Sequence, residues 1–284
     1  MSISERRLGV HTSIAGGIPL SLERARELGC STMQIFSHNP RQWLANKIPA
    51  DSAARFRELR RAYDIDPVYI HTSYLINLAS LNNDMLDKSI QLLIREMDLA
   101  DSLEADYVVL HTGSASQDSG ENARKRAIGA LKVVAGLKKW ESRLLLENTA
   151  GERGDISSRI EDLAEIIGQT GNPLIAGVCM DTCHAFAAGY DVSGKDGLSE
   201  LVKAIEKWLG IDSVKLIHLN DSKKGCNSRV DRHEHIGEGG IGAEGLEMFV
   251  NHPAFRNIPL ILETPKKSEE DDPRNLKVVR GLLR

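Results

Sequence analysis

The feature that most constrains this chain is an alternation, repeated eight times, of short apolar runs with longer segments whose apolar residues recur at helical spacing. Short apolar runs bounded by turn residues indicate strands buried on both faces, and the segments between them indicate crossover helices. This order is typical of a parallel sheet covered by helices. The expected strands are Leu8–Val10, Met33–Phe36, Val68–Ile70, Tyr107–Leu110, Leu144–Leu146, Gly177–Met180, Lys215–Leu219 and Leu260–Leu262.

Two of the segments between the strands carry apolar stripes that should pack on the sheet. The first stripe is Ile90, Leu93, Ile94 and Met97, and the second is Leu198, Leu201, Val202, Ile205 and Trp208. A further helix is expected from Asn275 to the C-terminus, which gives the last strand its own helix. The 284 residues therefore predict one α/β domain, residues 1–284, folded as a (β/α)8 TIM barrel, and a closed barrel is favoured over an open sheet.

Ligand-type side chains stand at the end of six of the eight expected strands. They are His71, His111, Glu147, Asp181, His218 and Glu263. All strands of a parallel barrel end on one face, and that face carries the active site of enzymes with this fold. A buried cluster of carboxylates and imidazoles is costly unless cations compensate it. Three more residues of the same types, His184, Asp231 and His233, lie in neighbouring segments.

The mixture of imidazole and carboxylate in this set suits zinc, with manganese or iron as alternatives. Nine ligands suggest three metal ions, and three divalent ions would leave the site with a formal charge of about +2. That balance favours phosphoryl chemistry, because clustered divalent ions activate a water for in-line attack and stabilise the departing oxygen. The net charge of −4 excludes a wholly basic nucleic-acid binder. Binding to a polyanion would then be local to the metal ions.

At these residues the sequence closely resembles the endonuclease IV family of apurinic/apyrimidinic endonucleases. The resemblance is carried by HTSYLINLA at 71–79, CMDTCH at 179–184, HLNDSK at 218–223, SRVDRH at 228–233 and IGEGGIG at 236–242. It implies a first metal site of Glu147, His71 and His111, a second of Glu147, Asp181, His218 and Glu263, and a third of His184, Asp231 and His233. Glu147 would bridge the first two sites and serve as the catalytic residue. The implied cofactors are three Zn²⁺, with Mn²⁺ as the alternative at one site.

The resemblance also implies the substrate and the residues that contact it. The family cuts duplex DNA on the 5′ side of an abasic site, leaves a 3′-hydroxyl and removes groups that block 3′ ends. Arg41, Tyr74 and Leu75 would enter the DNA at the lesion, where the missing base makes extrusion of the sugar cheapest. From the residues alone, Tyr74 and Leu75 would be core residues and Arg41 a surface cation. Phosphate contacts are expected from Lys223, Arg229 and Arg232, next to Lys224 in the same loop.

Location and assembly follow from what the sequence lacks. It has no apolar run of membrane-spanning length and no signal peptide, so we expect no membrane partner and a cytoplasmic protein acting at the nucleoid. The four cysteines, Cys30, Cys179, Cys183 and Cys226, show no CxxC spacing and are expected to be reduced. A monomer would suffice for the expected activity.

Two other interpretations remain open from the residues. Metal-dependent sugar isomerases and epimerases share the barrel plan, but two metals would suffice for them. A damage-binding or metal-storing scaffold without catalysis is the third class. Strand scission of DNA that contains abasic sites indicates the nuclease, activity on free sugars indicates the isomerase, and tight binding to abasic DNA without scission indicates the scaffold.

Overall fold

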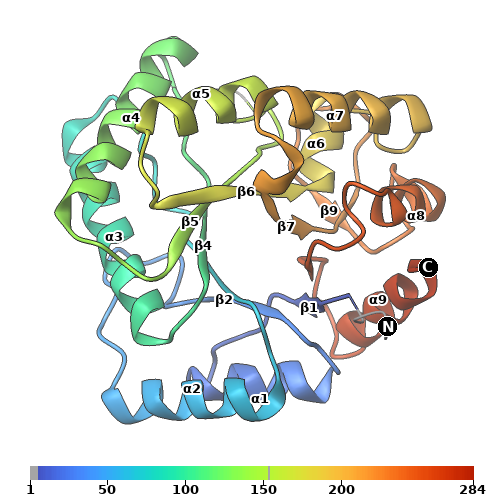
Figure 1. Ribbon diagram of the computed structural model, residues 1–284, viewed down its shortest axis with the longest axis horizontal. Coiled ribbons are helices and arrows are strands. Elements are labelled where there is room, and N and C mark those ends of the chain that lie inside the picture. The colour runs from blue at the N-terminus through green and yellow to red at the C-terminus, as the bar shows by residue number, and fades with distance from the viewer. Residues whose placement is uncertain (1–5, 153) are drawn as a thin grey trace.

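Eight parallel strands form the centre of the computed structural model, which describes residues 6–152 and 154–284 (Figure 1). They are β1 (Leu8–Val10), β2 (Met33–Phe36), β3 (Val68–His71), β4 (Tyr107–Leu110), β5 (Arg143–Glu147), β6 (Ile175–Asp181), β7 (Val214–His218) and β10 (Leu260–Leu262). Their order in the sheet is β1-β10-β7-β6-β5-β4-β3-β2. The expected TIM barrel is therefore confirmed.

The two edge strands of this sheet, β1 and β2, meet just beyond the end of β1. His11 and Gln34 form a single parallel bridge there, and the Thr12 N–H donates to the Gln34 carbonyl at 2.8 Å. Gly9 permits the approach, because a Cβ at that position would lie 1.9 Å from the Thr32 carbonyl oxygen. The barrel is nearly closed at this junction.

Several strands extend beyond the apolar runs that predicted them. β3, β5 and β6 end on His71, Glu147 and Asp181, whereas the sequence placed these residues just after each strand. Backbone pairing continues through them, as between Glu147 and Cys179. A prediction based on apolar runs finds the hydrophobic part of a strand. It does not include a polar residue at the end of the strand that still pairs with the neighbouring strand.

Helices surround the barrel on its outer face (Figure 1). They are α1 (Pro19–Glu27), α2 (Ala50–Tyr63), α3 (Asn83–Ser102), α4 (Gly120–Leu137), α5 (Ile160–Thr170), α6 (Thr182–Ala188), α7 (Lys195–Trp208), α8 (Gly242–Asn251) and α9 (Asp271–Leu282). A short 3-10 turn, η1 (Ile211–Ser213), precedes β7. The last helix begins four residues before the expected Asn275.

The apolar stripes of α3 and α7 pack as expected, with one exception. Leu93 and Leu201 are fully buried, and each such side chain contributes about 1.5–3 kcal/mol by leaving water. Trp208 is instead 47 % exposed. It is the last residue of α7, and the Lys207 ammonium lies 4.6 Å from its ring centre. The expectation that Trp208 packs on the sheet is wrong because the helix ends there.

The long segment after β7 folds around one buried carboxylate. Its two short strands, β8 (Asp221–Ser222) and β9 (His233–Glu234), pair antiparallel. Both oxygens of Asp221 accept backbone N–H groups from the glycine-rich turn, donated by Gly237, Gly239, Ile241 and Gly242 at 2.9–3.4 Å. This arrangement fixes the turn that leads into α8.

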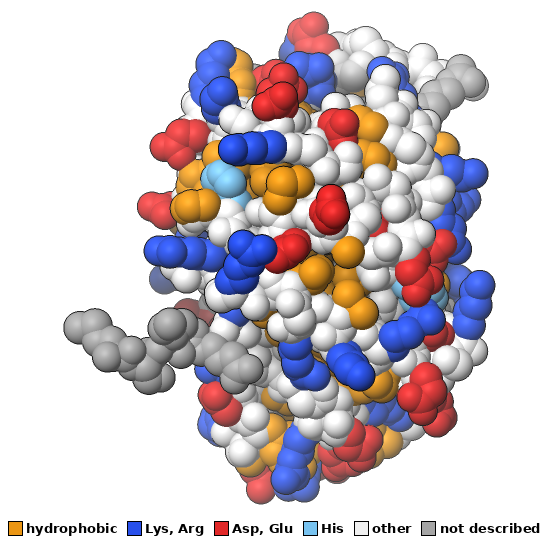
Figure 2. All heavy atoms as spheres, turned by 90° about the vertical axis from the view of Figure 1, so that its right-hand side faces the viewer, with side chains coloured by type: hydrophobic (Ala, Val, Ile, Leu, Met, Phe, Trp, Pro, Cys, Tyr) orange, Lys and Arg blue, Asp and Glu red, His pale blue; other side chains and the backbone are white. Residues whose placement is uncertain are grey.

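The outer surface gives no sign of a large single-charge area on the side drawn in Figure 2. Lys and Arg side chains are interspersed there with Asp and Glu, and hydrophobic side chains form only small groups. No helix within the described residues is long and apolar enough to cross a membrane.

Candidate metal centre

The barrel interior positions the centre. A separate apolar cluster inside the barrel consists of Tyr69, Val109, Leu145, Cys179, Leu216 and Ile261, one residue from each of six strands. Two positions further along these strands lie His71, His111, Glu147, Asp181, His218 and Glu263. Residues two apart on a strand share a face, so the polar side chains continue the same inward column beyond the apolar layer.

The nine ligand-type residues predicted from the sequence come together in three groups, two of which share a residue. Potential ligand atoms lie within 4.8 Å of one another in each group. The groups are His71, His111 and Glu147; Glu147, Asp181, His218 and Glu263; and His184, Asp231 and His233. Glu147 belongs to the first two. Cys179 and Cys183 lie close enough to join two further groups, with Glu147 and His218 and with Asp181 and His233 respectively.

Three of the histidine rings use one nitrogen on the surrounding protein and direct the other into the centre. His71 Nδ1 pairs with the Thr72 carbonyl at 2.8 Å, and His184 Nδ1 with the Asn148 carbonyl at 2.9 Å. His233 Nδ1 pairs with the Glu263 carbonyl at 3.0 Å. Because a carbonyl only accepts, these Nδ1 atoms carry a proton, and in the neutral ring the lone pair lies on Nε2, where a cation can be bound. Metal-ligating histidines are oriented in this way.

Asp181 connects the centre to the short helix α6. One of its oxygens accepts the His184 N–H at 2.8 Å and caps the helix, while Asn220 donates to the other at 2.6 Å. Asn148 holds the Asp181 backbone on both sides, donating to its carbonyl and accepting its N–H. The cap therefore sets the position of His184 relative to Asp181.

The carboxylates of the centre are held ionised by the imidazoles around them. Burial alone would raise the pKa of Glu147, but His111 and His218 lower it well below its usual value. Burial likewise opposes protonation of His218, yet Cys179, Glu263 and Glu147 raise its pKa well above the usual value. The centre is thus built to hold positive charge next to its carboxylates, which is the electrostatic condition for binding cations.

Two buried nitrogens supply a direct test of whether cations fit. His184 Nε2 and His233 Nε2 are enclosed and have no hydrogen-bond partner in the described part of the chain. A buried, unpaired polar atom costs about 1–3 kcal/mol. Both atoms face Asp231, at 3.3 and 3.4 Å from its oxygens. A cation between them would satisfy both lone pairs, so the donor set fits a metal ion.

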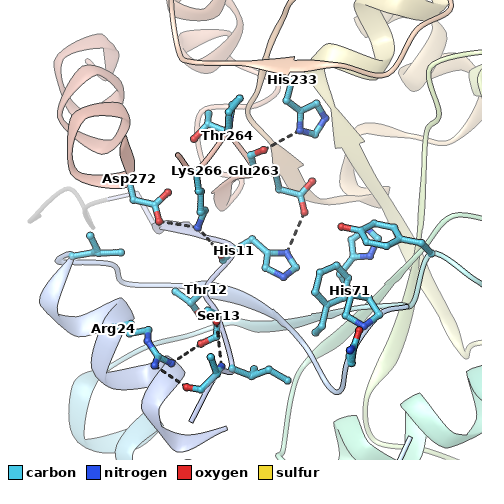
Figure 3. Close-up of a pocket in the computed structure, with 18 of the residues that line it drawn as sticks. His11, Thr12, Ser13, Arg24, His71, His233, Glu263, Thr264, Lys266 and Asp272 are labelled. Atoms are coloured by element: carbon cyan, nitrogen blue, oxygen red, sulfur yellow. Dashed lines mark hydrogen bonds and ion pairs between the residues drawn. The ribbon is translucent and has the colours of Figure 1, made fainter. Parts of the chain in front are cut away.

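A cavity of about 1290 Å³ opens over this centre. Figure 3 shows His11, His71, His233 and Glu263 pointing into it from different strands, with Thr12, Ser13 and Arg24 along one side. Lys266 and Asp272 form an ion pair of 2.7 Å at its edge. The space is large enough for a nucleotide unit rather than a water molecule alone.

The residues expected to enter DNA lie at or beside this cavity. Tyr74 lines it and is 66 % exposed, with its ring edge-on to Phe36 at 5.2 Å. Leu75 is half-buried and Arg41 is exposed. The interpretation of Tyr74 as a core residue is therefore wrong.

A buried network ties the segments that carry these residues together. The Ser73 hydroxyl donates to the Pro40 carbonyl at 2.6 Å, and the Ser73 N–H donates to Glu96 at 3.0 Å. Burial raises the pKa of Glu96 to about 8, although the Ser73 N–H opposes the shift. Glu96 was not anticipated from the sequence, where it appears as one charged residue in a helix.

The basic residues expected to contact phosphates lie in the long segment after β7. Lys223, Arg229 and Arg232 are all exposed. Arg232 lines the cavity and donates to the Asp231 carbonyl at 2.5 Å, whereas the Lys223 ammonium lies 3.8 Å from Glu234. Of the three, only Arg232 borders the cavity.

Two rim residues complete the ring of strand ends. Gln34 on β2 is fully buried and contacts His218 at 2.8 Å and Glu263 at 2.6 Å. His11 follows β1 and lies 3.3 Å from Glu263. Gln34 was missed because an amide is not a metal ligand of choice. Its place two residues before the end of a strand was the signal that could have identified it.

Comparisons with known proteins agree with this geometry. Residues 22–283 match the model of the family described as xylose isomerase-like TIM barrel. A protein of Halothermothrix orenii named "Probable endonuclease 4" is 42 % identical over 278 residues, which cover 98 % of this chain and 99 % of the relative.

Two solved structures resemble this chain, one in sequence and fold and the other in fold alone. The crystal structure of endonuclease IV from Thermus thermophilus is 39 % identical, has a TM-score of 0.86 and covers 98 % of both chains. A D-tagatose 3-epimerase-like protein has a TM-score of 0.73 at 20 % identity, over 98 % of this chain and 97 % of that one. The second likeness extends to the fold alone.

Proposed function

We propose that this chain, which belongs to the xylose isomerase-like TIM barrels and among them to the endonuclease IV family, is a metal-dependent DNA-repair endonuclease. It hydrolyses the phosphodiester bond on the 5′ side of an abasic site in duplex DNA, leaves a 3′-hydroxyl and removes groups that block 3′ ends. We propose that residues 1–284 act as one domain and as a monomer, in the cytoplasm at the nucleoid.

The observation that carries this proposal is the convergence of nine ligand-type side chains, from position 71 to position 263, under one open cavity. Two groups share Glu147, and the third shares the same cavity wall. A polynuclear centre of this kind suits a reaction in which negative charge develops on several oxygens at once. Hydrolysis of a phosphodiester is such a reaction.

We assign the residues to three Zn²⁺ ions, with Mn²⁺ as the alternative at one of them. His71, His111 and Glu147 would hold the first ion, and His184, Asp231 and His233 the third. The second would be held by Glu147, Asp181, His218 and Glu263. When bound, these ions would activate a water molecule and neutralise charge on the phosphate.

The chain's own residues position the substrate for that step. The bond between phosphorus and the O3′ atom of the preceding nucleotide breaks, water supplies the new oxygen on phosphorus, and O3′ leaves as a hydroxyl. Glu147, as the catalytic residue, holds its two oxygens among four imidazoles at 2.9–3.3 Å. This fixed geometry keeps the phosphate aligned while the bond exchange occurs.

Recognition of the lesion would fall to the segments above the centre. The exposed Tyr74 ring and the Leu75 side chain would fill the gap left by the missing base, and Arg41 would enter from the neighbouring loop. Arg232 at the cavity edge, together with Lys223 and Arg229, would contact phosphates without reading sequence. The abasic sugar would then enter the cavity, which costs least where no base pair must be broken.

Sugar isomerase or epimerase activity is the weaker alternative. Its structural support is a likeness at 20 % identity, which extends to the fold alone. The third ligand group and the exposed aromatic residue beside the cavity have no use in a reaction on a small sugar.

The proposal is tested with a labelled duplex that carries one tetrahydrofuran abasic analogue, incubated with the zinc-loaded protein. We expect a single cut on the 5′ side that leaves an extendable 3′-hydroxyl. The matched duplex with an intact base should stay uncut. Absence of cleavage with three ions bound, or turnover of free ketoses instead, would contradict the proposal.

Tyr74→Ala provides the test of lesion recognition. Because the variant loses stacking of about 1–3 kcal/mol, we expect binding to the abasic duplex to weaken by about 5- to 150-fold. Removal of a 3′ block from a single-stranded end should change much less. Equal losses on both substrates, measured by titration and by end-trimming rates, would show that Tyr74 does not act at the lesion.

A further inference from the structure

Gln34 is an amide that touches several groups of the centre at once. Its side chain is fully buried on β2. Its Oε1 atom lies 2.8 Å from His218 Nε2, and its Nε2 atom lies 2.6 Å from Glu263 Oε1 and 3.0 Å from His11 Nδ1. His218 and Glu263 belong to the group assigned to the second cation. His11 and Gln34 also form the bridge that links β1 to β2.

Only one orientation of the Gln34 amide satisfies these contacts. Glu263 is an ionised carboxylate and can only accept, so the amide nitrogen must face it. The amide oxygen then faces His218 Nε2, which must carry a proton and donate it. His218 Nδ1, 3.0 Å from Glu147 and 3.3 Å from Glu263, is left as the nitrogen whose lone pair can face a cation.

The same orientation determines the state of His11. The second N–H of the Gln34 amide points at His11 Nδ1 at 3.0 Å, a shorter contact than the 3.3 Å between the same nitrogen and Glu263 Oε1. We therefore assign Nδ1 as the acceptor, which places the proton of the neutral ring on Nε2. His11 Nε2 is enclosed and has no hydrogen-bond partner among the residues that the structure describes. The ring lines the cavity and points into it between Glu263 and His71 (Figure 3).

We propose that Gln34 is a positioning residue that prepares His218 and Glu263 for the second cation and presents His11 to the substrate as a hydrogen-bond donor. The donor would meet an oxygen of the bound phosphodiester. Phosphate oxygens are strong acceptors, and the described residues of the cavity wall offer His11 Nε2 no other acceptor. The identity of this substrate rests on the proposed function, but the effect on the second cation does not.

The cation half of the proposal is tested with Gln34→Glu. This variant keeps the size of the side chain and an acceptor for His218, but it replaces the donor at Glu263 with a second carboxylate. We expect zinc to leave the loaded protein about 10- to 100-fold faster, measured by transfer to a chromophoric chelator. Gln34→Ala, which lacks both ends of the amide, should lose zinc at least as fast.

Gln91→Glu is the matched control, because Gln91 is exposed on α3 and the change adds the same charge far from the centre. Thermal unfolding of each metal-free variant shows whether its fold is retained. If Gln34→Glu folds and retains three zinc ions with the wild-type release rate, Gln34 is not a positioning residue for the cation. This readout needs no DNA, so it stands even if the protein fails to cut abasic sites.

The substrate half is tested with His11→Phe and His11→Gln in the zinc-loaded protein. Phenylalanine keeps the ring against Phe36, now at 4.4 Å between ring centres, but has no donor. Glutamine restores an N–H donor. We expect His11→Phe to weaken the binding of inorganic phosphate and to raise KM for abasic duplex by about 10- to 150-fold, the value of one hydrogen bond to a charged group.

His11→Gln should recover most of that loss, and zinc content should stay at the wild-type value in both variants. Unchanged phosphate affinity in His11→Phe would show that the unpaired nitrogen binds no substrate oxygen. Loss of zinc in His11→Phe would show instead that His11 acts on the metal ions, and it would overturn the assigned role.

Discussion

Glu147 illustrates how a single residue can be predicted from its place on a strand. It follows Leu144–Leu146 directly in the sequence, and in the structure it is fully buried among four imidazoles. The type and position of such residues are visible in the sequence because strand ends in a barrel face one rim. The hydrogen-bond partner of each ring nitrogen cannot be predicted from the sequence, because every residue has a backbone carbonyl and the sequence does not show which one, such as that of Asn148, lies next to the ring.

We expect Glu147→Gln to lower cleavage of abasic duplex by more than about 1000-fold, the scale of losing several kcal/mol of electrostatic stabilisation. The amide keeps the size of the side chain, so far-ultraviolet circular dichroism should be unchanged while the zinc content falls. Near-normal turnover in this variant would remove Glu147 from its assigned role.

Glu96 predicts a dependence of stability on pH. Burial raises its pKa from 4.5 to about 8, so the folded protein holds this proton more tightly than the unfolded chain does. The stability that the neutral carboxyl contributes is complete below pH 4.5 and is lost as the pH rises toward 8.

Glu96→Gln should remove this contribution to the slope, because its amide does not titrate. The measurement is the free energy of unfolding by urea at pH 6 and pH 8 for both metal-free proteins. Parallel pH dependences in the two proteins would show that Glu96 does not hold the proton.

At the scale of elements, the strands were easier to predict than the segments that follow them. β1, β2, β4 and β10 have the predicted bounds, because short apolar runs leave little choice. The segment after β7 has glycines and charges but no periodicity, and its shape depends on Asp221, whose backbone partners lie 16 to 21 residues further along. A contact of this range cannot be read from local spacing.

Asp221→Asn should therefore loosen an element rather than a single contact. One acceptor oxygen in place of two leaves buried N–H groups of the turn unpaired, at a cost of about 2–5 kcal/mol. Since Asp231 and His233 lie in the same segment, we expect the zinc content to fall from three ions toward two. Elemental analysis of the folded variant measures this, and an unchanged content with unchanged stability would contradict it.

At the scale of the whole molecule, the ligand cluster should couple the stability of the barrel to the binding of cations. The clustered carboxylates and imidazoles are compensated only in part by one another, as the His184 and His233 nitrogens without a partner in the described residues show. The family and its fold could be predicted from the sequence, because motif and periodicity agree. The cavity volume and the closing bridge between β1 and β2 could not, because they depend on how eight strands tilt together.

Removal of the metal ions should lower the melting temperature of the entire protein. An ion present at 100 times its dissociation constant stabilises the fold by about 2.7 kcal/mol, so we expect a loss of at least about 5 °C on chelation. Binding should also release protons, because the pKa of His218 lies well above its usual value before the ion arrives. Calorimetry in two buffers of different ionisation enthalpy measures the change in melting temperature and the number of protons released. A melting temperature that a chelator does not change would show that metal binding and folding are not coupled.

The single bridge between His11 and Gln34 gives the sheet a seam. Everywhere else around the circumference neighbouring strands share a ladder, but β1 and β2 are fastened mainly by the two residues whose side chains reach Glu263. A separation of β1 from β2 at this junction would displace Glu263, which belongs to the group of ligands assigned to the second cation. Because Gln34 and His11 both contact Glu263, a cation held by Glu263 and His218 would also help to keep the junction of β1 and β2 closed.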